Sequence, residues 1–115
     1  MKLHDKVSIL GTEYTIFKDV LETEQSIIKG NDGVTDFTTK QILIAPMEQD
    51  TPDSWQDIER YESRTIRHEI IHAILFESGL DHNAGWPRNE EIVDWMAIQF
   101  PKMLEIFEAL SVEKF

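Results

Sequence analysis

Three residues within a stretch of five have the types and the spacing of a zinc site. His68 and His72 are four residues apart, so on a helix they lie on one face, one turn from each other. Two imidazoles in that arrangement can bind one zinc ion at about 2.0–2.1 Å each. Glu69 can reach the open side of such a metal, where a water would bind. The stretch therefore offers two metal ligands and a general base.

A catalytic zinc ion usually has three protein ligands, so the third must come from another part of the chain. The metzincin pattern is excluded because Leu75 and Ser78 occupy the positions at which that pattern has glycine and the third histidine. The remaining candidates are His82, Glu90 and Glu91.

Helical register favours Glu90 among these candidates. Glu90 and Asp94 are four residues apart and share a helical face, whereas Glu91 shares its face with Trp95. An inward face would place the first carboxylate on the metal. Asp94, one turn away, would accept the outer ring N–H of a ligating histidine and fix its tautomer. We expect His82 or Glu91 to bind the metal only if this register is wrong.

The segments before the histidines predict strands. Residues 6–20 alternate in a period of two around a turn at Gly11-Thr12, which is typical of a β-hairpin. Residues 34–37 predict a short strand. Residues 41–45 form the clearest strand. Two interpretations are open: the strand is an ordinary part of the sheet, or it lies beside the metal and offers its edge to a peptide.

The first motif is predicted to lie on a helix. Thr51 as N-cap and Pro52 at the first helical position predict its start, and Gly79 predicts its end. One helix of this length would be unusual, so a break is expected near residues 59–63.

The second motif is predicted to lie on another helix, after a loop at residues 81–87. This helix should begin near Pro87 or Asn89 and should be interrupted by Pro101. A last helical segment is expected at residues 103–110. Together with the strands, these helices predict an α+β fold.

The composition limits the classes of function. A chain of 115 residues predicts a single domain, residues 1–115. The absence of cysteine excludes disulfides, cysteine nucleophiles and thiolate metal sites. A net charge of −11 argues against direct binding of nucleic acid. Without a signal peptide or a long apolar run, a cytoplasmic protein with no membrane partner is expected.

The two motifs together resemble those of the gluzincin metallopeptidases. The closer resemblance is to the small ImmA/IrrE-type metallopeptidase-like proteins of phages, prophages and mobile elements. Their second motif runs Glu-x-x-Ala-(Asp/Asn)-x-Phe-Ala, followed by an apolar stretch that ends in proline. Residues 90–101 match this pattern except at Val93 and Met96, and the resemblance covers residues 30–101.

The resemblance implies a minigluzincin-like (zincin) domain, in which a small β-sheet packs on two motif helices, here followed by a C-terminal helical segment. It implies Zn²⁺ as the cofactor and a cytoplasmic setting, the host cytoplasm if the protein is phage-encoded. It also implies hydrolysis of peptide bonds in a protein substrate such as a repressor, with Glu69 as general base.

Other readings of the same residues stay open. The stretch from His68 to Phe76 is also similar to the motif helix of SprT-like proteases, which take a third histidine from a downstream loop. His82 would be that histidine here, although its spacing is short and the chain lacks a basic DNA-binding extension. A zinc-stabilised binding module without catalysis and a metal-free structural protein are the further alternatives.

Overall fold

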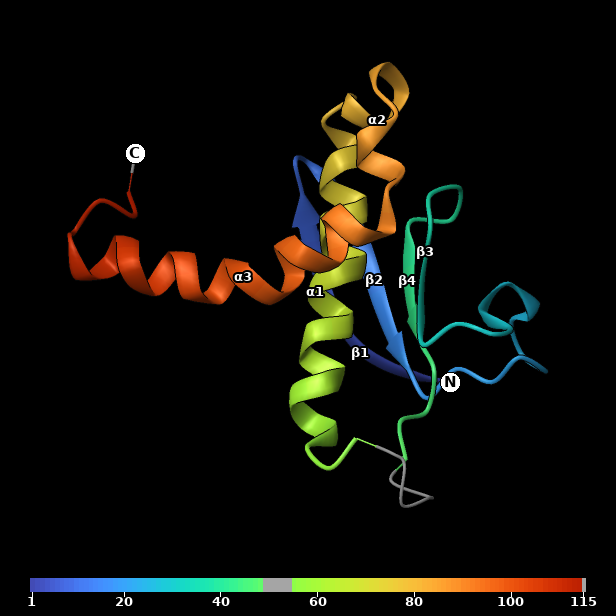
Figure 1. Cartoon of the computed structure of the whole chain (residues 1–115). Coiled ribbons are helices and arrows are strands. Elements are labelled where there is room, and N and C mark those ends of the chain that lie inside the picture. Colours follow the sequence, from blue (N-terminus) through green and yellow to red (C-terminus); the bar gives the residue numbers. More distant parts are fainter. Residues whose placement is uncertain (49–54, 115) are drawn as a thin grey trace.

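The fold is an α+β arrangement of a small mixed sheet and helices. A computed structural model describes residues 1–48 and 55–114. The sheet has the order β1-β2-β4-β3 and is drawn in Figure 1. Its strands are β1 (Lys2–Ile9), β2 (Thr12–Lys18), β3 (Gly33–Asp36) and β4 (Gln41–Ile44). β4 pairs parallel with β2 and antiparallel with β3.

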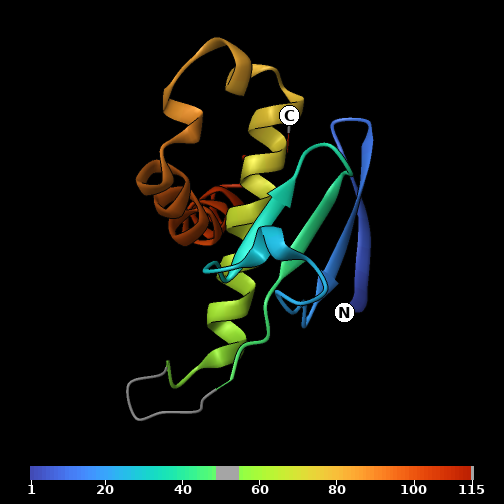
Figure 2. The same ribbon diagram turned by 90° about the vertical axis from the view of Figure 1, so that its right-hand side faces the viewer.

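Two long helices form two further layers beside the sheet. Figure 2 shows α1 lying between the sheet and α3. The helices are η1 (Ser26–Ile28), α1 (Ile58–Glu77), α2 (Leu80–Asn83), η2 (Trp86–Arg88) and α3 (Glu90–Ala109). Within the described ranges, no helix combines the length and the apolar character needed to cross a lipid bilayer.

The main core lies between the sheet and α1. β4 contributes Ile42 and Ile44 to it, and Ala73 comes from α1, all of them fully buried. The next side chain along β4, Leu43, points to the opposite face, where it packs with Val20 and Ile28. Both faces of β4 are therefore buried, which explains why this segment is the most hydrophobic strand of the sequence.

The predicted β-hairpin is confirmed, with a shift of one residue at its turn. β1 and β2 pair antiparallel, and Ile9 lies opposite Thr12. The two turn residues are therefore Leu10 and Gly11, whose φ angles are 49° and 90°. Two consecutive positive φ values are typical of the turn that best fits the twist of a two-residue hairpin. β1 also begins earlier than expected, at Lys2.

The interpretation that residues 41–45 offer an edge to a peptide is wrong. β4 is hydrogen-bonded on both sides, to β2 and to β3, so it has no free edge. β3 is the edge strand on the side of the sheet near the histidines. The alternation of apolar residues predicted the strand, but its place in the sheet depends on pairing between distant segments.

The start of α1 differs from the prediction. The predicted cap residues Thr51 and Pro52 lie outside the described residues. α1 begins at Ile58, and the side chain of Asp57 caps it by accepting the backbone N–H of Arg60 at 3.1 Å. The expected break near residues 59–63 is wrong, because α1 is continuous from Ile58 to Glu77.

The end of α1 agrees with the prediction. Gly79 follows the last turn with a φ of 86°, a conformation that glycine adopts without steric cost. The predicted loop at residues 81–87 contains two short helical turns, α2 and η2.

α3 begins as expected but is not interrupted. Asn89 caps the helix by accepting the backbone N–H of Ile92 at 3.0 Å. The prediction that Pro101 interrupts the helix is wrong, because α3 continues to Ala109. Proline leaves the carbonyl of the residue four positions earlier without its usual donor, and here that residue is Ala97. The Nε of Arg67 donates to this carbonyl at 2.8 Å, so the interior of α3 keeps its hydrogen bonding.

Candidate metal centre

α1 presents the two motif histidines side by side, as their spacing predicts. The Nε2 atoms of His68 and His72 are 3.2 Å apart. Both side chains are largely buried, with 14% and 16% of their surface exposed. Burial lowers the pKa of His72, which favours the neutral imidazole that binds metals.

α3 brings Glu90 to these nitrogens. Its Oε2 lies 2.8 Å from Nε2 of His68, and its Oε1 lies 2.9 Å from Nε2 of His72. Donor atoms on a tetrahedral zinc with bonds of about 2.0–2.1 Å are roughly 3.4 Å apart. The two nitrogens and the carboxylate are therefore close to the spacing of three ligands of one metal ion. This His-His-Glu group can hold a metal ion, and its donor set fits zinc.

The other two candidates for a third ligand lie elsewhere. His82 is on α2, where its ring packs edge-on against Phe76 with centroids 4.7 Å apart. Glu91 lines a shallow depression with Ile92 and Trp95. Helical register correctly placed Glu90, and not Glu91, on the face toward α1.

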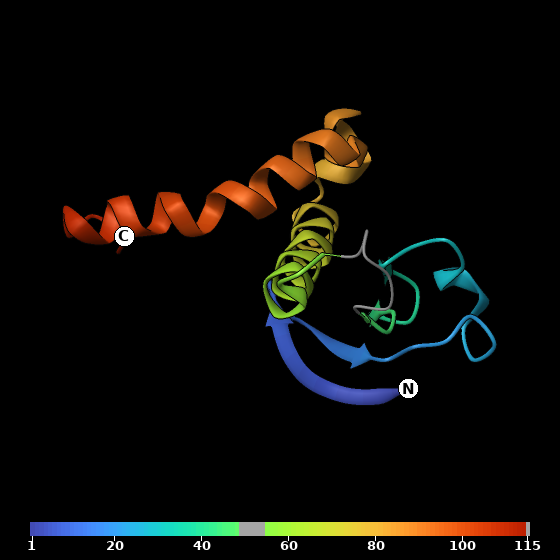
Figure 3. The same cartoon turned by 60° about the horizontal axis from the view of Figure 1, so that its bottom comes forward.

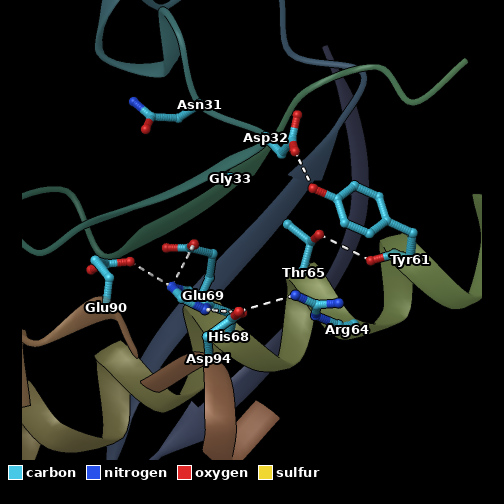
Figure 4. Close-up of a pocket in the computed structure, with 10 residues that line it drawn as sticks. All are labelled: Asn31, Asp32, Gly33, Tyr61, Arg64, Thr65, His68, Glu69, Glu90 and Asp94. Atoms are coloured by element: carbon cyan, nitrogen blue, oxygen red, sulfur yellow. Dashed lines mark hydrogen bonds and ion pairs between the residues drawn. The ribbon is translucent and has the colours of Figure 1, made fainter. Parts of the chain in front are cut away.

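Asp94 approaches the outer nitrogen of His68, as its register predicts. Its Oδ1 lies 3.3 Å from Nδ1 of His68. Its Oδ2 accepts a hydrogen bond from Arg64 at 3.0 Å. Arg64 thus orients Asp94, and Asp94 orients the ring whose Nε2 faces Glu90 (Figure 4). Sequence reasoning missed Arg64, although its position four residues before His68 places it on the same face of α1.

Glu69 is held beside the metal-binding group and is not part of it. Its side chain is buried, and its Oε2 lies 4.0 Å from Nε2 of His68. The hydroxyl of Thr35, on β3, lies 2.9 Å from Oε1 and 3.0 Å from the backbone oxygen of Glu69. Burial raises the pKa of Glu69, while His68 and the Thr35 hydroxyl act in the opposite direction. A carboxylate in such surroundings is suited to accept and release a proton.

A glycine allows β3 to approach α1 at this point. A Cβ atom at Gly33 would lie 2.9 Å from Cγ2 of Thr65 and 3.0 Å from Cγ of Glu69. The first separation is too short for two carbon atoms and the second is very tight, so a larger residue would push against Thr65 and Glu69 or displace the strand. Nothing in the sequence signalled this close approach.

Two clefts meet at the centre. The first has a volume of about 190 Å³ and extends from Glu69 and Glu90 toward Tyr61, which donates a hydrogen bond to Asp32. Figure 4 shows the residues that line it. The second has a volume of about 250 Å³ and extends along β3 past Thr35. The metal-binding group thus lies at the middle of an open path that follows the edge strand.

Comparison of the chain with models of protein families, with curated proteins and with solved structures found no match.

Proposed function

We propose that this protein is a zinc metallopeptidase with a minigluzincin-like fold. The observation that carries the proposal is the convergence of His68, His72 and Glu90 beside the buried carboxylate of Glu69. Two imidazoles and one carboxylate leave a fourth position of a tetrahedral zinc free, which is the ligand set of a catalytic site. A metal with a purely structural role usually has four protein ligands.

The proposed chemistry is hydrolysis of a peptide bond. When bound, zinc would supply Lewis acidity to a water molecule and to the carbonyl group of the substrate. Glu69 takes the proton of the attacking water and passes it to the leaving amine. Thr35 holds the Glu69 carboxyl in position for both transfers. Asp94 and Arg64 hold His68 so that its Nε2 stays directed at the metal.

An extended segment of a protein is the substrate that fits the site best. β3 is an edge strand, and one of the two clefts runs along it. An extended peptide can pair with such an edge through its backbone, which places one of its carbonyl groups near the metal. The resemblance of residues 30–101 to ImmA/IrrE-type proteins supports a cytoplasmic protein substrate such as a repressor.

Metal binding is tested by comparing two adjacent glutamates. Zinc at about 100 times its Kd should stabilise the wild-type protein by roughly 2.7 kcal/mol. Glu90→Ala should lose most of this gain, whereas Glu91→Ala should keep it, because Glu91 points away from the histidines. The measurement is thermal unfolding with and without zinc, together with zinc analysis of the purified protein. The proposal would be overturned if the purified wild-type protein contained no zinc and if added zinc did not raise its stability.

Catalysis is tested with Glu69→Gln. This variant should bind zinc as the parent does and should fail to cleave phage and host repressors that the parent cleaves. Cleavage at the parental rate would show that Glu69 is not the general base.

A catalytically silent zinc-binding module is the second candidate. The deep burial of Glu69 and its contacts with Thr35 favour it, since they leave the carboxyl little surface for a substrate. Zinc binding without cleavage of any repressor by the parent protein would support this candidate.

A further inference from the structure

The C-terminal half of α3 projects away from the rest of the molecule. Figures 1 and 3 show it extending past α1, with the body of the protein at its other end. α3 packs on α1 and η2 through residues near its start, where Val93 and Ala97 are fully buried. We call residues 99–110 the arm. Every residue from Phe100 to Leu110 is exposed.

The surface of α3 carries a largely apolar stripe, interrupted by Gln99. Its residues recur at alternating intervals of four and three, the spacing with which two helices pack along each other. They are Ile92, Met96, Gln99, Met103, Ile106 and Leu110. Trp95, Phe100 and Phe107 flank this stripe and are 57%, 56% and 41% exposed. The stripe lies on a different face of α3 from Val93 and Ala97, so the packing against α1 does not cover it.

We propose that α3 pairs with α3 of a second copy of this chain and forms a homodimer along this stripe. The area of the stripe agrees with that of a dimer interface. An aromatic side chain buries roughly 150–250 Å², so the three flanking aromatic residues alone expose about 300 Å². With the aliphatic residues, the surface approaches the about 800 Å² per partner of a standard interface. It also exceeds the largest apolar patches of most monomers, which are about 300–600 Å².

The distribution of charge favours a second copy as the partner. The whole chain has a net charge of −11, so most faces of two copies repel each other. Residues 95–110 carry one lysine and two glutamates, Lys102, Glu105 and Glu108. Glu105 and Glu108 lie on the side of the arm away from the stripe, whereas Lys102, four residues before Ile106, lies at the border of the stripe. The arm is therefore the part of α3 at which two acidic copies can approach with the least repulsion.

Pro101 does not prevent such pairing. Arg67 occupies the carbonyl of Ala97 that the proline leaves free, so α3 continues to Ala109 as one helix. The seam can thus extend over the full 20 residues of α3, about 30 Å.

The test compares one glutamate introduced on the stripe with one introduced beside it. Ile106→Glu places a carboxylate in the seam, whereas Ala109→Glu adds the same charge on the side that carries Glu105. Both positions are exposed in the single chain, so both variants should keep the fold, which circular dichroism and thermal unfolding verify. Sedimentation equilibrium of the full chain in the micromolar range then gives the mass.

We expect the wild-type protein and Ala109→Glu to have twice the monomer mass of 13.4 kDa. Ile106→Glu should weaken the association by about tenfold or more, because a carboxylate would be buried without a partner. A wild-type protein that stays at 13.4 kDa would overturn the proposal. Equal dissociation by both variants, or a dimer that persists in Ile106→Glu, would overturn it as well. Neither outcome tests the proposed metal centre, because the stripe contains none of the residues of that centre.

Discussion

The Nε of Arg67 donates a hydrogen bond to the carbonyl of Ala97, the one acceptor in α3 that Pro101 leaves without a helical donor. The contact joins the middle of the motif helix to the middle of α3. It replaces the missing helical donor, and α3 continues beyond the proline.

The importance of this contact can be measured with a double-mutant cycle. Arg67→Met keeps the apolar stem of the side chain and should cost about 1–3 kcal/mol, because the carbonyl of Ala97 loses its donor. In a Pro101→Ala background the cost should be smaller, since the alanine N–H supplies a helical donor to that carbonyl. Urea unfolding at equal protein concentration gives the free energies. Equal costs in both backgrounds would contradict the assignment.

Thr35 should set the acidic limit of catalysis. Its hydroxyl stabilises the ionised form of Glu69, so Thr35→Val should raise the pKa of that carboxyl. A general base must be ionised, and therefore the acidic limb of the kcat/KM profile of the zinc-loaded enzyme should move to higher pH. Thr35→Ser keeps the hydroxyl and should retain the parental profile. Identical limbs for the valine and serine variants would argue against the role of this hydrogen bond.

Arg64 and Asp94 should support metal affinity without touching the metal. Asp94→Ala removes the partner of the outer nitrogen of His68 and should weaken zinc binding by about 10- to 100-fold. Arg64→Met should have a smaller effect in the same direction, because Asp94 loses only its own anchor. Arg60→Met is the matched control, since Arg60 lies one turn earlier on α1 and pairs with Asp57. Competition with a chelator measures the three affinities, and an equal loss in the control would refute the argument.

Glu77 should make the fold sensitive to acid. It lies at the end of α1, where the helix dipole disfavours a carboxylate, and it accepts hydrogen bonds from Lys40, Tyr14 and Thr12. The hydrogen bond from Lys40, followed by that from Tyr14, lowers the pKa of Glu77 from 4.5 to about 2. Because this pKa is lower in the folded state, the stabilisation is present above pH 4.5 and is lost as the pH falls toward 2.

The variant Glu77→Gln tests this linkage. It should cost about 1–2 kcal/mol at neutral pH, because hydrogen bonds to a charged acceptor are replaced by weaker ones. Below pH 4.5 the difference from the parent should shrink. Glu22→Gln, at an exposed position in the loop after β2, should leave stability unchanged at every pH. The measurement is chemical unfolding at a series of pH values, and a difference that stays constant with pH would contradict the prediction.

The sequence by itself determined the parts of the centre that depend on helical periodicity. The four-residue spacing of His68 and His72, and that of Glu90 and Asp94, placed each pair on one face before any fold was known. The same rule separated Glu90 from Glu91. These relations lie within single helices, where the backbone geometry is fixed locally.

Tertiary structure decided which elements meet at the centre. Thr35 and Gly33 both lie on β3, and they reach Glu69 because this strand forms the edge of the sheet beside α1. Their contacts depend on the order of the strands in the sheet. The continuation of α3 through Pro101 depends on Arg67, which bonds the carbonyl of Ala97 from thirty residues earlier in the chain. Such contacts arise from the packing of segments that are distant in sequence, and the spacing of residues along one segment carries no information about them.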